Sequence, residues 1–432
     1  MSSPALLFYG DDFTGATDAL GTAARGGLRT LLFLGTPDQQ RLAAAGPLDC
    51  IGIAGAARSM SPEAMREELA PVAAIARVLK PRVLHYKTCS TFDSAPHVGS
   101  IGEAVRVLAP ALDSPSLAIV GGQPNLGRYC LFGNLFAAAG AQGEVFRIDR
   151  HPTMSRHPVT PMDEADLRLH LARQGLKHIA LVPLSAYAQG TGALAPHMAR
   201  LDAGGARAVL WDVAEASHLK QIGGHLWAQA TREPLMAVGP SSVVDALAQA
   251  IRGDAPPAVQ SICAAQGPVL VLAGSLSPVT ASQVAAASSF DVLRLRAQQL
   301  TAQDGAYLAD AARQLAAGLA ADRHMLACTV GADGSRTDLP AGALAQAGGA
   351  LLKEVLRLSP QVRRVGIAGG DTSSLAVRAI DAWALAYAGL LAPGVPLCTL
   401  RSDDARLDGL ELMLKGGQMG GSDVFERLVA GT

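Results

Sequence analysis

Two adjacent carboxylates near the start of the chain are the residues best suited to chemistry. Asp11 and Asp12 follow an apolar run, Leu6–Gly10, and precede an Ala/Leu-rich stretch that predicts a helix beginning near Ala16. In α/β proteins, ligands bind in the crevice beyond the carboxyl ends of the strands. Two carboxylates side by side there repel each other and lose hydration unless a ligand or metal compensates. The pair therefore predicts a ligand site, and the second interpretation is that Asp12 or Thr14 only caps the helix.

Cationic and hydroxyl side chains follow other apolar runs in the same half of the chain. Lys87 ends one such run and is followed by a polar turn with Ser90 and Thr91, and Arg128 closes a glycine-rich turn after Leu117–Gly122. A guanidinium matches the geometry of a carboxylate, and a lysine supplies a point charge for a small anion. This half is therefore predicted to bind a small acid.

A cationic loop over residues 147–162 contains three arginines, two histidines and three prolines. Arg147 and Arg150 are interpreted as solvated surface residues. His151 and His157 fit either ordinary loop histidines or ligand contacts. No spacing of carboxylate and histidine in this loop predicts a metal site.

Three glycine-rich turns in the second half of the chain predict a nucleotide site. In each, an apolar run ends in glycines, and hydroxyls or a lysine stand beside them. The turns are Gly274–Ser277, Gly369–Ser373 and Lys415–Gly421. Glycines let a backbone approach an anion, and a helix that starts behind them offers free N–H groups and a positive dipole end. Each turn alone also fits a tight strand–helix connection with a cap, but three in one domain favour nucleotide binding.

Other sequence fingerprints of nucleotide binding or hydrolysis are absent. The chain contains no G-x-x-x-x-G-K-[ST] loop and no G-x-G-x-x-G turn. It also contains neither a G-x-S-x-G elbow nor an H-E-x-x-H helix.

The elements that must position these residues alternate along the chain. Short apolar runs, each ending in Gly, Ser, Thr or a charge, are separated by Ala/Leu-rich stretches with helical spacing, such as Pro62–Val78 and Gly305–Ala321. This alternation is typical of parallel sheets buried on both faces. The fold class is therefore α/β. The predicted strands include Thr30–Gly35, Cys50–Ala54, Arg82–Tyr86, Leu117–Gly122, His178–Leu184, Arg207–Val213, Leu235–Gly239, Val269–Gly274, Asp291–Leu295, Met325–Val330, Val365–Gly370 and Leu397–Leu400.

Length and proline content predict two domains. The chain has 432 residues, which is more than one average domain. Pro256 and Pro257 lie in a linker-like stretch, since prolines at this density favour an extended spacer. We expect domains at 1–253 and 268–432 with a linker at 254–267. Each is expected to be a mainly parallel sheet flanked by helices, with the active site in the interdomain cleft.

Composition narrows the partners. Net charge is −1 with no basic block, which disfavours nucleic acid. No run reaches the roughly 20 apolar residues of a membrane span. The first lysine or arginine is Arg25, so the charged start that is typical of a signal peptide is not expected here. Six scattered cysteines without a C-x-x-C pair indicate reduced thiols in a cytoplasmic protein. Cys89 is interpreted as a small buried residue.

Six motifs occur in an order that is typical of one known family. They are Asp11–Ala16, Lys87–Ser94, His157–Met162, Gly274–Ser277, Gly369–Ser373 and Lys415–Gly420. On these motifs the chain resembles the four-carbon acid sugar kinase family over nearly its whole length. The resemblance implies a first domain that binds a sugar acid such as threonate, erythronate or a 3-oxo-tetronate, and a second domain that binds ATP.

The chemistry of phosphoryl transfer suggests roles for residues of the first domain, and the resemblance implies the nucleotide contacts of the second. Asp12 is the candidate catalytic base, and Asp11 holds sugar hydroxyls or Mg²⁺, although the two roles could be exchanged. The expected substrate-binding residues are Asp11, Lys87, Ser90, Thr91, Arg128 and His157. The expected nucleotide contacts are Ser275, Ser277, Gly369, Gly370, Asp371, Thr372, Lys415, Gly417 and Gly420. Asp371 is an alternative holder of Mg²⁺ through water.

Two other functions share these features. A ligase that cleaves ATP to activate a carboxylate would need the same two sites, and so would a sensor of sugar acids that has lost catalysis. The expected partners are a small sugar acid and ATP, with no nucleic acid and no membrane, and a homodimer is left open.

Overall fold

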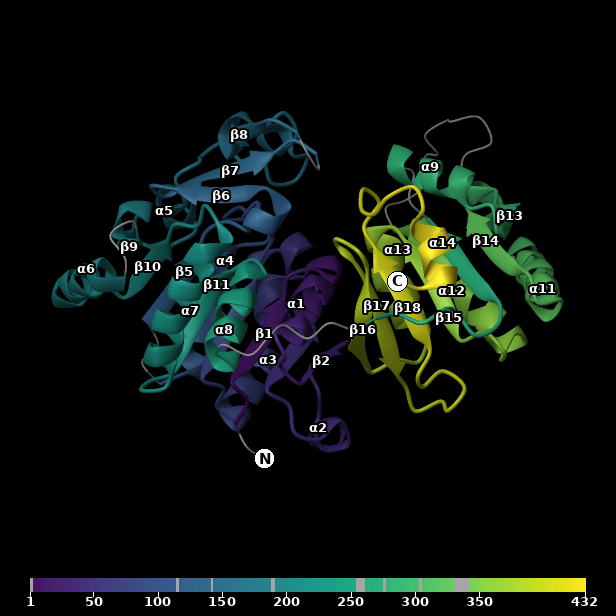
Figure 1. Ribbon diagram of the computed structural model, residues 1–432, viewed down its shortest axis with the longest axis horizontal. Helices are drawn as coiled ribbons and strands as arrows, with labels where there is room; N and C mark the ends of the chain where they lie inside the picture. Colours follow the sequence, from purple (N-terminus) through teal and green to yellow (C-terminus); the bar gives the residue numbers. More distant parts are fainter. Residues whose placement is uncertain are drawn as a thin grey trace. The chain divides into compact units, whose positions relative to one another are not determined.

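The chain forms two compact units, Met1–Ala258 and Val259–Thr432 (Figure 1). The computed structural model describes residues 3–113, 116–140, 143–187, 191–253, 261–274, 277–302, 305–329 and 342–432. The first seven residues of the expected linker, 254–260, and the end of the strand predicted at Met325–Val330 lie outside the described residues. Each unit is an α/β sheet flanked by helices, which confirms the predicted fold class.

The first unit is built on a parallel sheet with strand order β2-β3-β1-β4-β11-β5-β10-β9. The central strands β1 and β4 are buried along their whole length, as expected when helices cover both faces of a parallel sheet. The strands are β1 Leu6–Gly10, β2 Thr30–Phe33, β3 Cys50–Ala54, β4 Val83–Lys87, β5 Ser116–Val120, β9 Ile179–Val182, β10 Ala208–Trp211 and β11 Leu235–Gly239. The helices are α1 Phe13–Arg25, α2 Gln39–Ala45, α3 Pro62–Leu79, α4 Ile101–Leu108, α5 Leu167–Ala172, α6 Thr191–Ala203, α7 Ala216–Ala230 and α8 Ser242–Arg252.

A small antiparallel sheet in the first unit was not expected. It consists of β6 Arg128–Leu131, β7 Asn134–Ala138 and β8 Val145–Arg147. The β6–β7 hairpin turns through Phe132 and Gly133, which both have positive φ. The usual sequence signal of a two-residue hairpin is Asn-Gly or Asp-Gly. This hairpin has Phe-Gly instead, so the sequence does not predict it. Arg128, which was predicted to close a glycine-rich turn, is also the first residue of this hairpin.

The second unit has a mixed sheet with strand order β13-β14-β12-β15-β18-β17-β16. The first five of these strands are parallel, while β17 runs antiparallel to both β18 and β16. The strands are β12 Val269–Ala273, β13 Phe290–Arg294, β14 His324–Cys328, β15 Arg364–Ala368, β16 Ala384–Ala392, β17 Val395–Arg401 and β18 Glu411–Lys415. The helices are α9 Pro278–Ala286, α10 Ala297–Leu300, α11 Ala306–Ala320, α12 Ala343–Leu358, α13 Gly370–Ala379 and α14 Val424–Ala430.

Strand β16 was not predicted because its composition disfavours a strand. Four of its nine residues are alanine and one is glycine, and both types are depleted in strands. Pairing with β17 overrides this local preference, since the two strands form a long hairpin interrupted by bulges.

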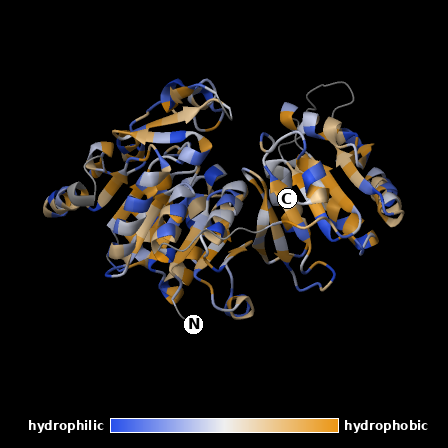
Figure 2. Ribbon diagram, in the orientation of Figure 1, coloured by the Kyte–Doolittle hydropathy of each residue, from blue (hydrophilic) through white to orange (hydrophobic). Residues whose placement is uncertain are grey.

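Hydrophobic residues are concentrated in the strands of each unit (Figure 2). In the second unit they form a core in which Val271 and Leu326 of the sheet pack with Phe425 and Leu428 of α14. Among the described residues, no helix is both long and apolar enough to cross a membrane.

Candidate functional site

The acidic pair and Lys87 lie together at the carboxyl edge of the first sheet. Strands β1 and β4 are parallel neighbours, and Gly10 is in register with Lys87. The backbone N–H of Asp11 donates to the Lys87 carbonyl at 3.0 Å. Two motifs separated by about 75 residues of sequence are thus adjacent because their strands are.

Asp12 caps helix α1. Its Oδ1 accepts a hydrogen bond from the backbone N–H of Gly15 at 3.0 Å. Gly15 also gives the lysine room, because a Cβ at this position would lie 1.7 Å from Lys87 Nζ and 2.4 Å from Asp12 Oδ1. The capping interpretation is therefore correct for one oxygen of Asp12, and it leaves Asp11 to be explained.

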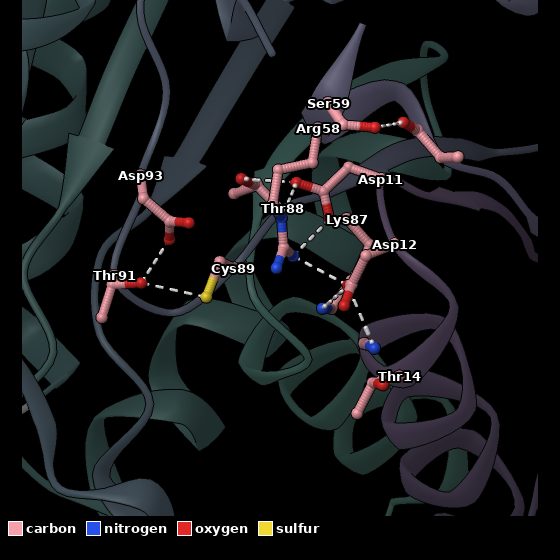
Figure 3. A network of polar contacts seen from close by, with 12 residues as sticks. Asp11, Asp12, Thr14, Arg58, Ser59, Lys87, Thr88, Cys89, Thr91 and Asp93 are labelled. Carbon is pink, nitrogen blue, oxygen red and sulfur yellow. Dashed lines mark hydrogen bonds and ion pairs between the residues drawn. The ribbon is translucent and has the colours of Figure 1, made fainter. Parts of the chain in front are cut away.

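Arg58 holds the two carboxylates together. It lies in the short helix η1 (Ala57–Ser59) beyond β3, the other neighbour of β1. Its Nη2 is 2.7 Å from Asp11 Oδ1 and 2.7 Å from Asp12 Oδ1, and its Nε donates to Asp11 Oδ2 at 3.2 Å. Figure 3 shows the guanidinium directed at both side chains. Arg58 was missed in the sequence because it belongs to no motif.

Two further groups complete this charge network. Lys87 Nζ lies 3.8 Å from Asp12 Oδ1, and the Thr88 hydroxyl donates to Asp11 Oδ2 at 3.3 Å. Two cations thus face two carboxylates, which is how a protein can hold such charges at a buried edge. Within the described residues, the Asp11 carboxylate forms an ion pair with Arg58 and accepts a hydrogen bond from Thr88.

The two carboxylates differ in exposure and acidity. The Asp11 side chain is 4% exposed, whereas that of Asp12 is 29% exposed. Burial raises the pKa of Asp11 despite the attraction of Arg58. Burial also opposes ionisation of Asp12, but Arg58 and Lys87 together bring the pKa of Asp12 below its usual value. Asp12 is therefore the more accessible member of the pair and the one whose ionised form is favoured.

The turn after β4 has its own hydrogen bonds. Ser90 and Thr91 are buried, and the Thr91 hydroxyl donates to Asp93 and lies 2.9 Å from Cys89 Sγ (Figure 3). Burial raises the pKa of the Cys89 thiol to about 11, so this thiol is neutral near pH 7.

Arg128 and His157 are held by other contacts. Arg128 begins β6 and donates to the Leu126 carbonyl, while its buried Nε has no partner among the described residues. Nδ1 of His157 accepts from the backbone N–H of Thr160 at 3.1 Å. Within the described ranges, no hydrogen bond or ion pair joins Arg128 or His157 to the acidic pair or to Lys87.

The three glycine-rich turns of the second unit lie side by side. Strands β12, β15 and β18 are adjacent and parallel, with Ala273, Ala368 and Lys415 in register at their carboxyl ends. The N–H of Gly274 donates to the Ala368 carbonyl at 3.0 Å, and that of Gly369 to the Lys415 carbonyl at 2.9 Å. The three glycine-rich turns predicted from the sequence are therefore neighbours at the carboxyl edge of the second sheet.

Close packing explains one of these glycines. A Cβ on Gly274 would lie 2.4 Å from the Thr372 hydroxyl. Thr372 and Gly370 lie in the first turn of α13, after Gly369 at the helix cap. Ser275 and the side chain of Asp371 lie outside the described residues.

The turn after β18 is held by helix α9. Ser277 caps this helix by accepting from the Thr280 N–H at 3.3 Å, and its hydroxyl donates to the Gly417 carbonyl at 2.6 Å. Lys415 is 1% exposed, and its ammonium donates to the Thr280 hydroxyl at 3.3 Å. Burial lowers the pKa of Lys415 to about 8. This edge therefore offers one buried cation among backbone groups.

No group of three or more His, Cys, Asp or Glu residues that could hold a metal occurs among the described residues.

Comparison with known proteins identifies the class first. A family of sugar-binding N-terminal domains matches residues 6–247, and a family of nucleotide-binding C-terminal domains matches residues 270–425. The chain is thus a two-domain protein that joins a sugar-binding domain to a nucleotide-binding domain.

Relatives of the whole chain then identify the family. The chain is 40% identical to a 3-oxo-isoapionate kinase of Paraburkholderia graminis, over 97% of this chain and 93% of the relative. It is 33% identical to a 3-oxo-tetronate kinase of Cupriavidus necator, over 98% of this chain and 96% of the relative. A solved Haemophilus influenzae protein with 24% identity has a TM-score of 0.78, covers 98% of each chain and supports the fold alone. The chain belongs to the four-carbon acid sugar kinase family.

Proposed function

We propose that this kinase transfers the γ-phosphoryl group of ATP to a hydroxyl of a small sugar acid of the threonate, erythronate or 3-oxo-tetronate type. Its relatives are named for 3-oxo-tetronate and for 3-oxo-isoapionate, which favours a 3-oxo acid. The observation that carries the proposal is the acidic pair, in which Arg58 binds both carboxylates and Asp12 is the more accessible.

Asp12 is the proposed base. As the substrate hydroxyl attacks the γ-phosphorus, an O–P bond forms, the bond to the β,γ-bridging oxygen breaks, and ADP leaves. The hydroxyl proton passes to the Asp12 carboxylate, whose lowered pKa keeps it ionised and ready to accept. Asp11, fixed by Arg58 and Thr88, orients Asp12 and the sugar hydroxyls.

The acid end of the substrate needs cations of its own. Lys87 lies beside Asp12 and is the first candidate. Arg128 is the second, since its buried Nε has no partner among the described residues and a guanidinium suits a carboxylate. Ser90, Thr91 and His157 are proposed to add hydrogen bonds.

The glycine-rich edge of the second unit is the proposed nucleotide site. We assign the phosphates to Gly369, Gly370, Gly417 and Gly420, with Thr372, Lys415 and the hydroxyls of Ser275 and Ser277 beside them. Mg²⁺, when bound, neutralises charge on the phosphates, and Asp371 at the start of α13 is the residue proposed to hold it through water. Lys415 is proposed to supply a positive charge beside the phosphates.

A product assay tests the proposal. The purified protein is incubated with ATP, Mg²⁺ and a panel of four-carbon acids including 3-oxo forms, and ADP and phosphorylated acid are quantified together. The expected result is equal amounts of ADP and phosphorylated acid with at least one member of the panel. AMP, or ADP that forms only with an added acceptor, would indicate a ligase instead, and binding without turnover would indicate a sensor. Light scattering on the same sample tests for the homodimer.

A further inference from the structure

A buried glutamine supports the loop that follows β18. Gln283 lies on α9 and is fully buried. Its Nε2 is 3.0 Å from each of three consecutive carbonyl oxygens, those of Met419, Gly420 and Gly421. One side chain thus contacts the whole second half of the loop.

The chemistry of the contact fixes the orientation of the amide. Three carbonyl oxygens can be satisfied only by a donor, so the NH₂ end of Gln283 faces the loop. Its two N–H groups are shared among three acceptors, so no water or other donor is needed there. The opposite atom, Oε1, is buried without a partner among the described residues. A buried acceptor without a hydrogen bond is unfavourable. We therefore attribute the glutamine at this position to the hydrogen bonds that its NH₂ group donates.

This contact determines where the loop's own N–H groups point. In a trans peptide the C=O and the following N–H point in opposite directions. With the carbonyls of Met419, Gly420 and Gly421 turned toward Gln283, the N–H groups of Gly420, Gly421 and Ser422 point away from α9. None of these three N–H groups donates a hydrogen bond to another described residue.

The first half of the loop repeats the arrangement. The Gly417 carbonyl accepts from the Ser277 hydroxyl at 2.6 Å and from the Thr280 hydroxyl at 3.0 Å, which turns the N–H of Gln418 outward in the same way. Successive free N–H groups with a common direction form an anion-binding concavity. Gly420 has φ of +85°, a conformation that favours glycine.

We infer that Gln283 is the positioning residue of the phosphate-binding loop. By holding three carbonyls, its amide directs the free N–H groups of Gly420, Gly421 and Ser422 at the phosphates of the nucleotide. Gln283 itself does not touch the nucleotide. The inference rests on the proposed nucleotide site and adds the residue that organises it.

The test is the variant Gln283→Glu. Glutamate has nearly the same side-chain shape as glutamine, but an oxygen that repels the three carbonyls replaces the NH₂ donor. We expect affinity for ATP and ADP to fall about tenfold or more, because several hydrogen bonds to buried carbonyls are lost. Affinity for adenosine should stay within twofold, since it lacks phosphates. Gln299→Glu makes the same change at an exposed position on α10 of the same unit and should leave all three affinities unchanged.

A second variant, Gln283→Asn, tests the same inference if Gln283→Glu does not fold. Gln283→Asn keeps the amide donor but withdraws it by one methylene, so a smaller loss of affinity that is still confined to ATP and ADP is expected. Competition against a fluorescent nucleotide gives the affinities, and sugar-acid binding and thermal unfolding are followed in parallel.

The outcomes separate the inference from the function on which it rests. Unchanged ATP affinity in Gln283→Glu overturns the inference and leaves the kinase proposal intact. Equal losses for adenosine and ATP also overturn it, because a residue that only stabilises the unit would act in that way. Failure of the unmodified protein to bind ATP with Mg²⁺ overturns the proposed function itself.

Discussion

The carboxyl edges of the two sheets are built from different groups. At the edge of the first unit, Asp11, Asp12, Arg58 and Lys87 form a network of opposite charges. At the edge of the second unit, three glycine-rich turns lie side by side, and Lys415 is a buried cation next to them. The first edge therefore presents charged side chains, and the second consists mainly of glycine-rich backbone.

This difference follows from what each edge is proposed to bind. Hydroxyls and a carboxylate on a small acid must be told apart atom by atom, and a proton must be moved, which requires charged side chains of defined pKa. A triphosphate offers many equivalent oxygens, which free N–H groups can bind without a change in protonation. Substitutions should accordingly abolish chemistry at the first edge and weaken binding at the second.

The largest effect is expected for Asp12→Asn. Asparagine still caps a helix, but it cannot accept the hydroxyl proton, so kcat should fall about 10²–10⁴-fold. ATP affinity, measured by calorimetry, should not change, because the proposed nucleotide contacts lie on the second unit. Asp38→Asn is the matched control, since Asp38 also caps a helix of the first unit, accepting from Arg41 N–H at 2.8 Å, and is exposed. Near-normal turnover in Asp12→Asn would exclude Asp12 as the base.

The next effect concerns the stability of the same edge. Arg58→Met leaves the buried Asp11 carboxylate without its main partner, which should lower the free energy of unfolding by about 3 kcal/mol. Arg29→Met is the control. Arg29 contacts the carboxylate of Asp49 through two nitrogens, as Arg58 contacts that of Asp11. The pair of Arg29 and Asp49 is exposed and should contribute little.

Adding Asp11→Asn to Arg58→Met checks the cause of the loss. The double variant should regain part of the stability in urea unfolding, because the unpaired charge is gone. A loss for Arg29→Met equal to that for Arg58→Met would mean that burial of the Asp11 carboxylate does not govern the stability of this edge.

The fold could be predicted from the sequence where strands are apolar runs with clear ends. All of the parallel core strands of the first unit were found in this way, with differences of a few residues at their ends. The β6–β7 hairpin and β16 were missed because their pairing, and not their local composition, makes them strands.

The candidate site could be predicted only as far as its motifs. Asp11, Asp12 and Lys87 stand out because each follows an apolar run, and parallel pairing of β1 with β4 joins them. Arg58 is 46 residues from Asp12 and in a short helix. Its only signal was its place four residues after the end of β3, the strand on the other side of β1. Gln283 had no signal at all, because it is one of three polar residues in the short helix α9. Only the tertiary structure shows the three carbonyls that it contacts.

The smallest effect should appear at the second edge as a dependence on pH. The pKa of Lys415 is lowered by burial from its ordinary value near 10.5 to about 8. Phosphates are attracted by the ammonium form, so ATP affinity should fall gradually as the pH rises from 7 through 9. Lys415→Arg should remove this dependence, because arginine stays charged throughout the range, and Lys415→Met should bind ATP several-fold more weakly at pH 7 with no dependence.

The stability of the free protein should respond in the opposite direction. Between about pH 8 and 10.5, Lys415 is neutral in the folded state and still protonated in the unfolded state, so the unfolded state binds more protons. The contribution of Lys415 to the free energy of unfolding therefore rises with pH in this window, while affinity for ATP falls. Lys353→Met, at an exposed lysine on α12, should change neither slope. If ATP affinity and stability changed with pH in the same direction, or if Lys415→Arg kept the dependence, the buried cation of the second edge would not be the group that meets the phosphates. The contrast with the first edge would then rest on peptide groups alone.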